Sequence, residues 1–136
     1  MTLELKHLVG YLPYGLKFRV NLSDVQENYN NELREFTLTT ANLDLLLGYG
    51  GKPILRPLSD LTKEIDGVVH LDIIKEIYPN VPNFYSLLRT KTLDLFALCD
   101  TIVEYCVVQY LFQHHFDVFS LIDNNLAIDI NKIENE

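Results

Sequence analysis

Cysteine, glycine, proline and tryptophan are all scarce in this chain of 136 residues. Six glycines and five prolines are too few for a collagen-like or disordered chain, and the hydrophobic and charged fractions of 48% and 22% are those of a globular protein. The two cysteines, Cys99 and Cys106, would stand about 10 Å apart along a helix, which is too far for a disulfide. The length leaves room for one domain.

Basic residues are few as well. Eleven Lys and Arg stand against 19 Asp and Glu, which gives a formal net charge of -8. This balance argues against direct binding to nucleic acid or to an anionic membrane. Residues 69–136 hold ten of the acids and four of the bases, and the stretch from Thr92 to Asn131 holds six acids and no base. We therefore expect an electronegative surface there, whose simplest use is to keep the protein in solution.

Long apolar runs are also missing. At the N-terminus Glu4 and Lys6 interrupt the leucines, so no secretory signal is expected. The longest uncharged stretch through the apolar centre, residues 105–116, contains Gln and His and is shorter than the roughly 20 apolar residues that a membrane helix needs. The sequence therefore predicts a cytoplasmic protein without a membrane span.

Apolar residues at the start of the chain recur with helical spacing. The i, i+3, i+4, i+7 pattern predicts a short amphipathic helix on Leu5, Leu8, Val9 and Leu12. Gly10 should weaken this helix, and Pro13 should end it. The apolar face of this helix would need a sheet to pack against.

Two later segments alternate between apolar and polar residues, as half-buried strands do. Residues 16–22 and 35–39 predict an antiparallel pair, with the polar residues 23–31 as the loop between them. In such a pair the side chains of Lys17 and Arg19 can face Glu35 across the strands.

The rest of the chain predicts short elements and one longer helix. A brief strand at the sheet edge is expected at residues 54–55, because Pro53 and Pro57 flank it. Residues 84–98 fit a strand and a helix equally well. The other expected elements are a short helix from Ser59 or Asp60 to Ile65, another that Asp72 caps, a core helix over residues 101–115 with a capping box at its start, and a strand over residues 126–130.

Together these elements predict an α+β fold, with a small antiparallel sheet packed against a C-terminal core helix and short helices. Residues 1–131 would form a single domain, and residues 132–136 a frayed acidic tail. The sequence contains no internal repeat and no low-complexity tract.

Catalytic signatures are missing from the sequence. The glycine-rich stretch at residues 48–53 departs from the Walker phosphate loop at two positions, and neither a G-x-S-x-G nucleophile nor an HExxH zinc pair occurs. The one local cluster of candidate metal ligands is His114, His115 and Asp117, but adjacent helical residues diverge by about 100°. The sequence therefore assigns no catalytic residue, metal or cofactor, and it favours a protein that is not an enzyme.

Three blocks of the chain have a distinctive sequence, at residues 12–18 (LPYGLKF), 52–65 (KPILRPLSDLTKEI) and 114–131 (HHFDVFSLIDNNLAIDIN). These blocks resemble a family of small uncharacterised proteins from gut bacteria that are encoded by prophages or mobile elements. The resemblance covers 39 of the 136 residues, implies a mobile-element origin and carries over no catalytic residue. The family has glycine at the positions of Ser120 and Asn125. Asparagine can adopt the left-handed backbone of glycine, whereas serine predicts a less tight turn.

Two of these blocks place polar residues beside apolar ones that a helix or strand would bury. The working surface is therefore predicted around five residues, Arg56, Asp60, His114, His115 and Asp117. An alternative use for two of them is an ion pair between Arg56 and Asp60 or Asp117, which would hold the edge segment against the core helix.

The missing catalytic signatures favour an accessory protein that binds another macromolecule, and a protein is the expected partner. A metal-dependent hydrolase is one alternative, which would use His114, His115 and Asp117 with Asp123 or Asp129. The other alternative is an acidic inhibitor that mimics DNA for a basic partner. It would present the acids between Thr92 and Asn131, which are Asp94, Asp100, Glu104, Asp117, Asp123 and Asp129.

Overall fold

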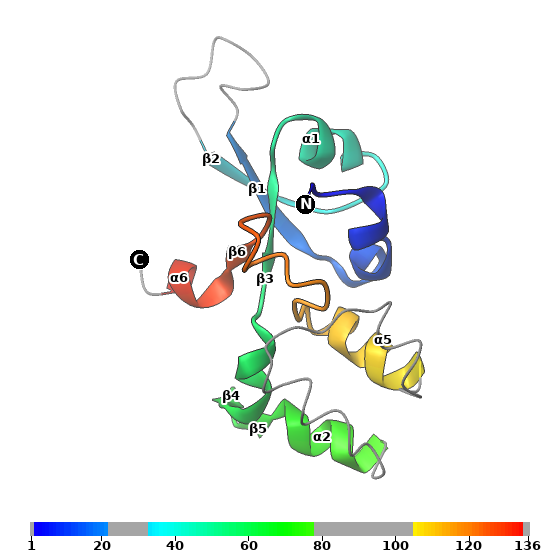
Figure 1. Cartoon of the computed structure of the whole chain (residues 1–136), viewed down its shortest axis with the longest axis vertical. Coiled ribbons are helices and arrows are strands. Elements are labelled where there is room, and N and C mark those ends of the chain that lie inside the picture. Colours follow the sequence, from blue (N-terminus) through cyan, green and yellow to red (C-terminus); the bar gives the residue numbers. More distant parts are fainter. Residues whose placement is uncertain (1, 22–32, 78–104, 135–136) are drawn as a thin grey trace.

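The computed structural model describes residues 2–21, 33–77 and 105–134, which form an α+β fold, as the sequence predicted (Figure 1). Four strands form a mixed sheet in the order β2-β1-β3-β6, and two more form a hairpin, β4-β5. The strands are β1 (Lys17–Asn21), β2 (Leu33–Thr37), β3 (Lys52–Leu55), β4 (Glu64–Ile65), β5 (Val68–Val69) and β6 (Ile128–Asp129). The α-helices are α1 (Leu43–Gly48), α2 (His70–Ile77), α5 (Tyr105–Gln113) and α6 (Ile130–Glu134), and the 3-10 helices are η1 (Leu5–His7), η2 (Val9–Tyr14) and η4 (Leu58–Thr62).

The predicted antiparallel pair is present as β1 and β2. Arg19 lies directly opposite Glu35 in the register. The Lys17 ammonium and the Arg19 guanidinium lie 3.5 and 3.7 Å from the Glu35 carboxylate, so the expected cross-strand ion pairs form. The alternation of β1 buries Phe18 and Val20 and turns their neighbours outward. The predicted loop at residues 23–31 lies outside the described residues.

The prediction of an edge strand at residues 54–55 is wrong, because β3 lies between β1 and β6. β1 pairs antiparallel with Lys52 and Pro53, and β6 pairs parallel with Ile54 and Leu55. Each neighbour contacts only two residues of β3, so the missing N–H of Pro53 interrupts no long ladder. Because β6 pairs in parallel with β3, the sheet is mixed, whereas the sequence predicted a purely antiparallel one. β6 has only two residues and covers the side of β3 that was expected to be the edge.

The N-terminal segment forms 3-10 helices instead of the expected amphipathic α-helix. Three residues per turn place Leu8 and Tyr11 one above the other, and both are fully buried. Leu5 and Val9, which the α-helical spacing placed on the buried face, are 48% and 53% exposed. Pro13 does not end the segment, because η2 continues to Tyr14.

Gly10 brings η2 against α5. A Cβ at this position would lie 2.5 to 2.7 Å from three carbons of the Phe112 ring, and that ring is held edge-on by Tyr11 at 4.8 Å. We therefore expect Gly10→Ala to lower the free energy of unfolding by about 1 to 3 kcal/mol in urea titrations, through overpacking. Gly48→Ala is the matched control. No atom lies within 4 Å of its Cβ position, so this change in α1 should stabilise the protein by up to about 1 kcal/mol. Equal effects of the two substitutions would contradict the close approach of η2 and α5.

The segment after η4 departs from the predicted helix to Ile65. The 3-10 helix η4 ends at Thr62, and β4 and β5 then form a hairpin around Asp66 and Gly67. Both turn residues have positive φ, 52° and 81°, which is the backbone that a tight two-residue hairpin turn requires. The next helix, α2, begins at His70, before the expected cap at Asp72.

The described part of the predicted core helix is α5, and a reversal of the backbone ends it. His115 has φ 61°, and its N–H donates to the Phe112 carbonyl at 3.1 Å. The N–H of Phe116 donates to the Leu111 carbonyl at 2.9 Å, which completes a Schellman motif with its usual apolar contact between these two side chains. The predicted capping box at residues 101–104 and the ambiguous segment at residues 84–98 lie outside the described residues.

A second reversal of the same type lies at Asn125, whose φ is 60°. The N–H of Asn125 donates to Ile122 and that of Leu126 to Leu121, at 3.0 and 2.8 Å. The predicted left-handed asparagine is therefore confirmed. Ser120 also has a positive φ, 59°, so serine adopts the left-handed backbone at this position.

Two hydrophobic clusters form the core. One joins the sheet to η2 and α1 and consists of Leu8, Tyr11, Leu16, Phe18, Val20, Leu38, Leu46, Leu55, Leu121 and Ala127. The other joins η4, α2 and α5 and consists of Leu58, Leu61, Leu71, Ile74, Leu111, Phe116 and Val118. Phe112 and Phe119 pack against both clusters. Figure 1 shows α2, α5 and the hairpin gathered at one end of the molecule, away from β1 and β2.

The C-terminal residues follow β6 into α6. Lys132 to Glu134, which the sequence placed in a frayed tail, belong to this short helix. None of the helices in the described part of the chain is long and apolar enough to cross a membrane.

Candidate functional site

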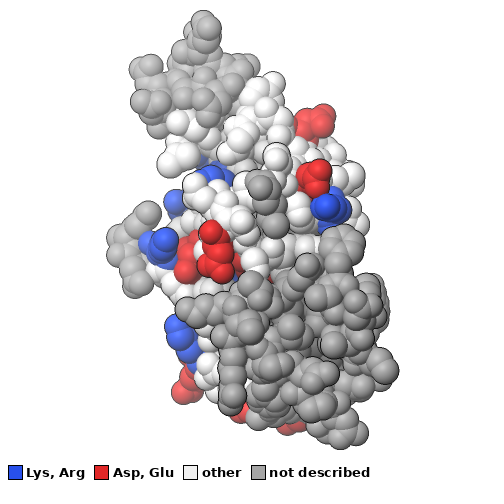
Figure 2. All heavy atoms as spheres, in the orientation of Figure 1, with Lys and Arg blue, Asp and Glu red and all other residues white. Residues whose placement is uncertain are grey.

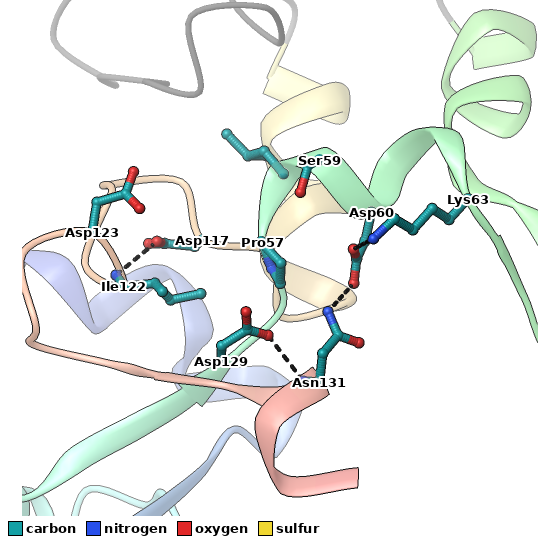
Figure 3. A pocket seen from close by; sticks show the side chains of 10 residues that line it. Pro57, Ser59, Asp60, Lys63, Asp117, Ile122, Asp123, Asp129 and Asn131 are labelled. Carbon is teal, nitrogen blue, oxygen red and sulfur yellow. Dashed lines mark hydrogen bonds and ion pairs between the residues drawn. The ribbon is translucent and has the colours of Figure 1, made fainter. Parts of the chain in front are cut away.

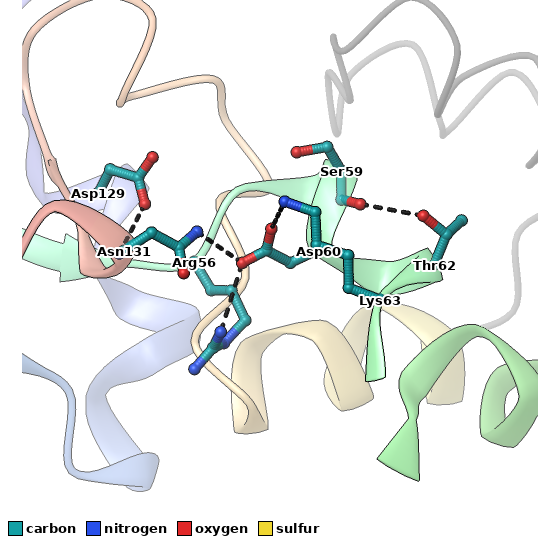
Figure 4. Close-up of polar contacts among 7 residues, drawn as sticks. All are labelled: Arg56, Ser59, Asp60, Thr62, Lys63, Asp129 and Asn131. Atoms are coloured by element: carbon teal, nitrogen blue, oxygen red, sulfur yellow. Dashed lines mark hydrogen bonds and ion pairs between the residues drawn. The ribbon is translucent and has the colours of Figure 1, made fainter. Parts of the chain in front are cut away.

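Arg56 and Asp60 form the centre of the candidate site. Arg56 follows β3 and Asp60 lies in η4, and Nη1 of the guanidinium is 3.3 Å from Oδ2 of the carboxylate (Figure 4). Their side chains are only 15% and 2% exposed. The ion pair considered from the sequence is thus present, and its acid is Asp60.

Two more side chains meet the Asp60 carboxylate. Asn131 donates from Nδ2 to Oδ2 at 2.8 Å, and the Lys63 ammonium lies 3.2 Å from Oδ1. Oδ1 is buried and forms no hydrogen bond within the described part of the chain. The Lys63 side chain is 65% exposed, so this oxygen depends on a solvated and weakly held ammonium.

The backbone of Arg56 joins the site to the end of α5. Its N–H donates to the His115 carbonyl, and its carbonyl accepts the N–H of Asp117, both at 2.8 Å. These two bonds form an isolated parallel bridge between Arg56 and Phe116. Segments from two of the three distinctive blocks therefore lie side by side.

His115 and Asp117 both have structural partners. Nε2 of His115 lies 2.7 Å from the Tyr14 carbonyl, so this nitrogen carries the proton and donates. Asp117 accepts the backbone N–H groups of Leu121 and Ile122 at 2.8 and 2.9 Å, and thereby holds the turn that follows it. Burial raises the pKa of the Asp117 carboxyl above its ordinary value, while these two N–H groups oppose the rise.

A pocket of about 380 Å³, here called the acidic pocket, opens beside this turn (Figure 3). Its lining comes from η4, from the turn after Asp117 and from the β6–α6 segment. Among the described residues, four carboxylates belong to its lining, those of Asp60, Asp117, Asp123 and Asp129, together with one base, Lys63. In Figure 2, exposed acidic side chains lie near the middle of the face of the molecule that is shown. The pocket is suited to a cation.

A second pocket of about 420 Å³, here called the histidine pocket, lies between α2, α5 and the hairpin. Arg56, His70, Tyr110 and His114 supply its polar groups. The ring centroids of His70 and His114 are 4.8 Å apart, and those of Tyr110 and His114 are 4.3 Å apart. The hydroxyl of Tyr110 is hydrogen-bonded to Nδ1 of His70.

Partial burial favours the neutral form of the imidazoles of this pocket. It lowers the pKa of His70 below 6.5, and the nearby charge of Arg56 lowers it further. Burial also lowers the pKa of His114, with smaller contributions from His70 and His115. The guanidinium of Arg56 is therefore the permanent positive charge in the lining of the histidine pocket.

The structure divides the five residues of the predicted surface. Asp60 and Asp117 line the acidic pocket, Arg56 and His114 line the histidine pocket, and His115 lines neither. The sequence interpretation missed further lining residues. Tyr110 lies in α5, and His114 follows four residues later, just past the end of the helix. This spacing signals one helix face, whereas no local pattern connects the two residues to His70, Lys63 or Asn131.

The candidate ligands of the metal-dependent alternative, His114, His115 and Asp117, do not converge on one point. The described residues include no group of three or more His, Cys, Asp or Glu side chains placed to hold a metal ion. His114 contacts His70, His115 is bound to Tyr14, and Asp117 is bound to the turn that follows it. Neighbours in sequence thus lie in three different environments.

Comparison with protein-family models, with curated proteins and with solved structures finds no significant match to this chain. The resemblance to proteins encoded by prophages or mobile elements therefore stays a prediction from the sequence.

Proposed function

We propose that the protein acts by binding a partner protein and that it receives a lysine or arginine side chain of that partner in the acidic pocket. The observation that carries this proposal is the buried Asp60 carboxylate, whose Oδ1 meets, among the described residues, only the exposed ammonium of Lys63. A partner's basic group could replace Lys63 there and also meet Asp123 and Asp129. The cytoplasmic location is a prediction from the sequence that fits this proposal.

The charge of the lining supports a cationic ligand. The structural hydrogen bonds of Asp117 and Asp129 satisfy oxygen atoms but leave the negative charge of each carboxylate in place. Asp123 is exposed and raises the pKa of Asp117 by repulsion, after the larger effect of burial. A DNA mimic has less support, because Asp117, one of the six acids that it would present, is buried.

Calorimetric titration with hexa-arginine and hexa-lysine peptides tests the proposal. We expect Asp123→Asn to weaken binding about tenfold, since it removes a charge-assisted contact from the pocket. Lys63→Ala should strengthen binding several-fold, because it removes the competing ammonium. The controls change net charge by the same amount elsewhere, with Asp44→Asn on α1 for the acid and Lys17→Ala on β1 for the base. If each variant and its control change binding equally, the attraction comes from net charge alone and the pocket is not the site.

A further inference from the structure

The histidine pocket contains hydrogen-bond donors that the fold leaves available. Within the described part of the chain, the Arg56 guanidinium donates a hydrogen bond through Nη1 only, and its acceptor is Asp60. His114 has an exposed side chain that makes ring contacts but no hydrogen bond to a described residue. His70 uses Nδ1 for Tyr110, which leaves Nε2 for a ligand.

The lining of the same pocket also includes aliphatic side chains. Ile65 and Val68 come from the two strands of the hairpin, and Ile73 comes from α2. The one carboxylate that the described residues contribute to the lining is that of Asp66, which is exposed in the turn of the hairpin. A pocket lined by both hydrogen-bond donors and aliphatic side chains has the features of a site for a small amphipathic anion.

We propose that the histidine pocket binds a small organic anion, whose carboxylate or phosphate group contacts Arg56, His70 and His114 and whose apolar part packs against Ile65, Val68 and Ile73. The volume of about 420 Å³ is within the range of small-molecule sites. A guanidinium is the side chain best suited to a planar or tetrahedral oxyanion, because its donors form a fixed fork.

This arrangement makes binding depend on pH. In the free protein, partial burial lowers the pKa of both imidazoles, and the charge of Arg56 lowers that of His70 further. A bound anion favours their protonated forms, so the complex takes up protons and becomes tighter as the pH falls from 8 to 6. The other groups that face these rings are Asp66, which attracts the charge on His70, and His115, which repels the charge on His114, while Tyr110 stays neutral with a raised pKa.

Titration of the whole chain with hexanoate, hexyl phosphate, inorganic phosphate and hexylammonium tests the proposal, with the side-chain NMR signals of the histidines as the readout. We expect both hexyl anions to shift the signals of His70 and His114, inorganic phosphate to bind more weakly, and hexylammonium to leave them unchanged. Inorganic phosphate that binds as tightly as hexyl phosphate would overturn the role of the aliphatic side chains. Hexylammonium that binds as tightly as hexanoate would overturn the anion site itself.

Variants locate the site and separate it from general charge effects. Hexanoate stays ionised between pH 6 and pH 8, so any change in its affinity reports the protein. We expect wild-type affinity to rise about tenfold over this range and the doubly substituted variant His70→Gln/His114→Gln to show a flat profile. Asp66→Asn should strengthen binding several-fold, whereas Asp72→Asn, on α2 outside the pocket, should not. A pH profile that both glutamines leave unchanged, or equal effects of the two aspartate variants, would overturn the proposal.

Discussion

Replacing Tyr11 with phenylalanine is expected to lower the free energy of unfolding by about 2 to 4 kcal/mol. The Tyr11 side chain is completely buried, and its hydroxyl donates to the Phe116 carbonyl and accepts the N–H of Val118 at 3.1 Å. Burial raises the pKa of this phenol far above its ordinary value, so the hydroxyl stays protonated. Without it, two buried backbone groups lose their partner, and each such loss costs about 1 to 3 kcal/mol.

Tyr14→Phe is the control for this substitution, and chemical denaturation monitored by circular dichroism is the measurement. The Tyr14 hydroxyl accepts a hydrogen bond from Gln109 at 3.0 Å in an exposed position. Water can replace this contact, so the loss should stay below about 1 kcal/mol. If Tyr11→Phe were as mild as Tyr14→Phe, the hydroxyl would not be holding the segment after α5.

Arg56→Ala is expected to lower the free energy of unfolding by about 3 kcal/mol or more. Both partners of the Arg56–Asp60 ion pair are largely withdrawn from water, and truncating one of them leaves a buried charge without its main partner. Asn131 and Lys63 still contact the Asp60 carboxylate, so we expect the lower end of the range of about 3 to 5 kcal/mol for a buried pair.

Lys63→Ala is the matched control, because it removes the other cation from the same carboxylate. The Lys63 side chain is 65% exposed, so this loss should stay below about 1 kcal/mol. Thermal and urea unfolding of both variants measure the difference. A near-native stability of Arg56→Ala would mean that the ion pair has no structural role and that the guanidinium is held for a ligand.

Local patterns were sufficient for the part of the fold that depends on neighbouring residues. The alternation in residues 16–22 and 35–39 predicted β1, β2 and the contacts of Glu35 with Lys17 and Arg19, because side chains of a strand alternate regardless of the rest of the fold. The left-handed backbone of Asn125 was also predicted from local sequence, because asparagine can adopt this conformation whatever the distant packing.

Local patterns failed where distant packing decides the outcome. The proline rule placed residues 54–55 at an edge, but the C-terminal strand covers that side of β3. The 3.6-residue period placed Leu5 and Val9 inside, whereas the segment forms 3-10 helices in which both residues are exposed. The hairpin was missed although Asp66-Gly67 is a strong turn signal, because the residues before it were assigned to a helix.

The candidate site shows the same division. Arg56 and Asp60 were predicted together because they are four residues apart in one block, and they form the ion pair. His114, His115 and Asp117 are adjacent in sequence, yet the left-handed turn at His115 sends them to different surroundings. His70 contributes to the histidine pocket only because α2 packs on α5, a tertiary contact with no trace in the local sequence.

The parallel bridge between Arg56 and Phe116 closes a long excursion of the chain. The two residues are 60 positions apart, and the segment between them leaves the sheet, passes through η4, the hairpin and α2, and returns along α5 to the same point. The entropy of closing a loop grows only slowly with its length, by about 0.6 kcal/mol for each doubling. Closing this long excursion at the bridge therefore costs only slightly more entropy than closing one of half its length.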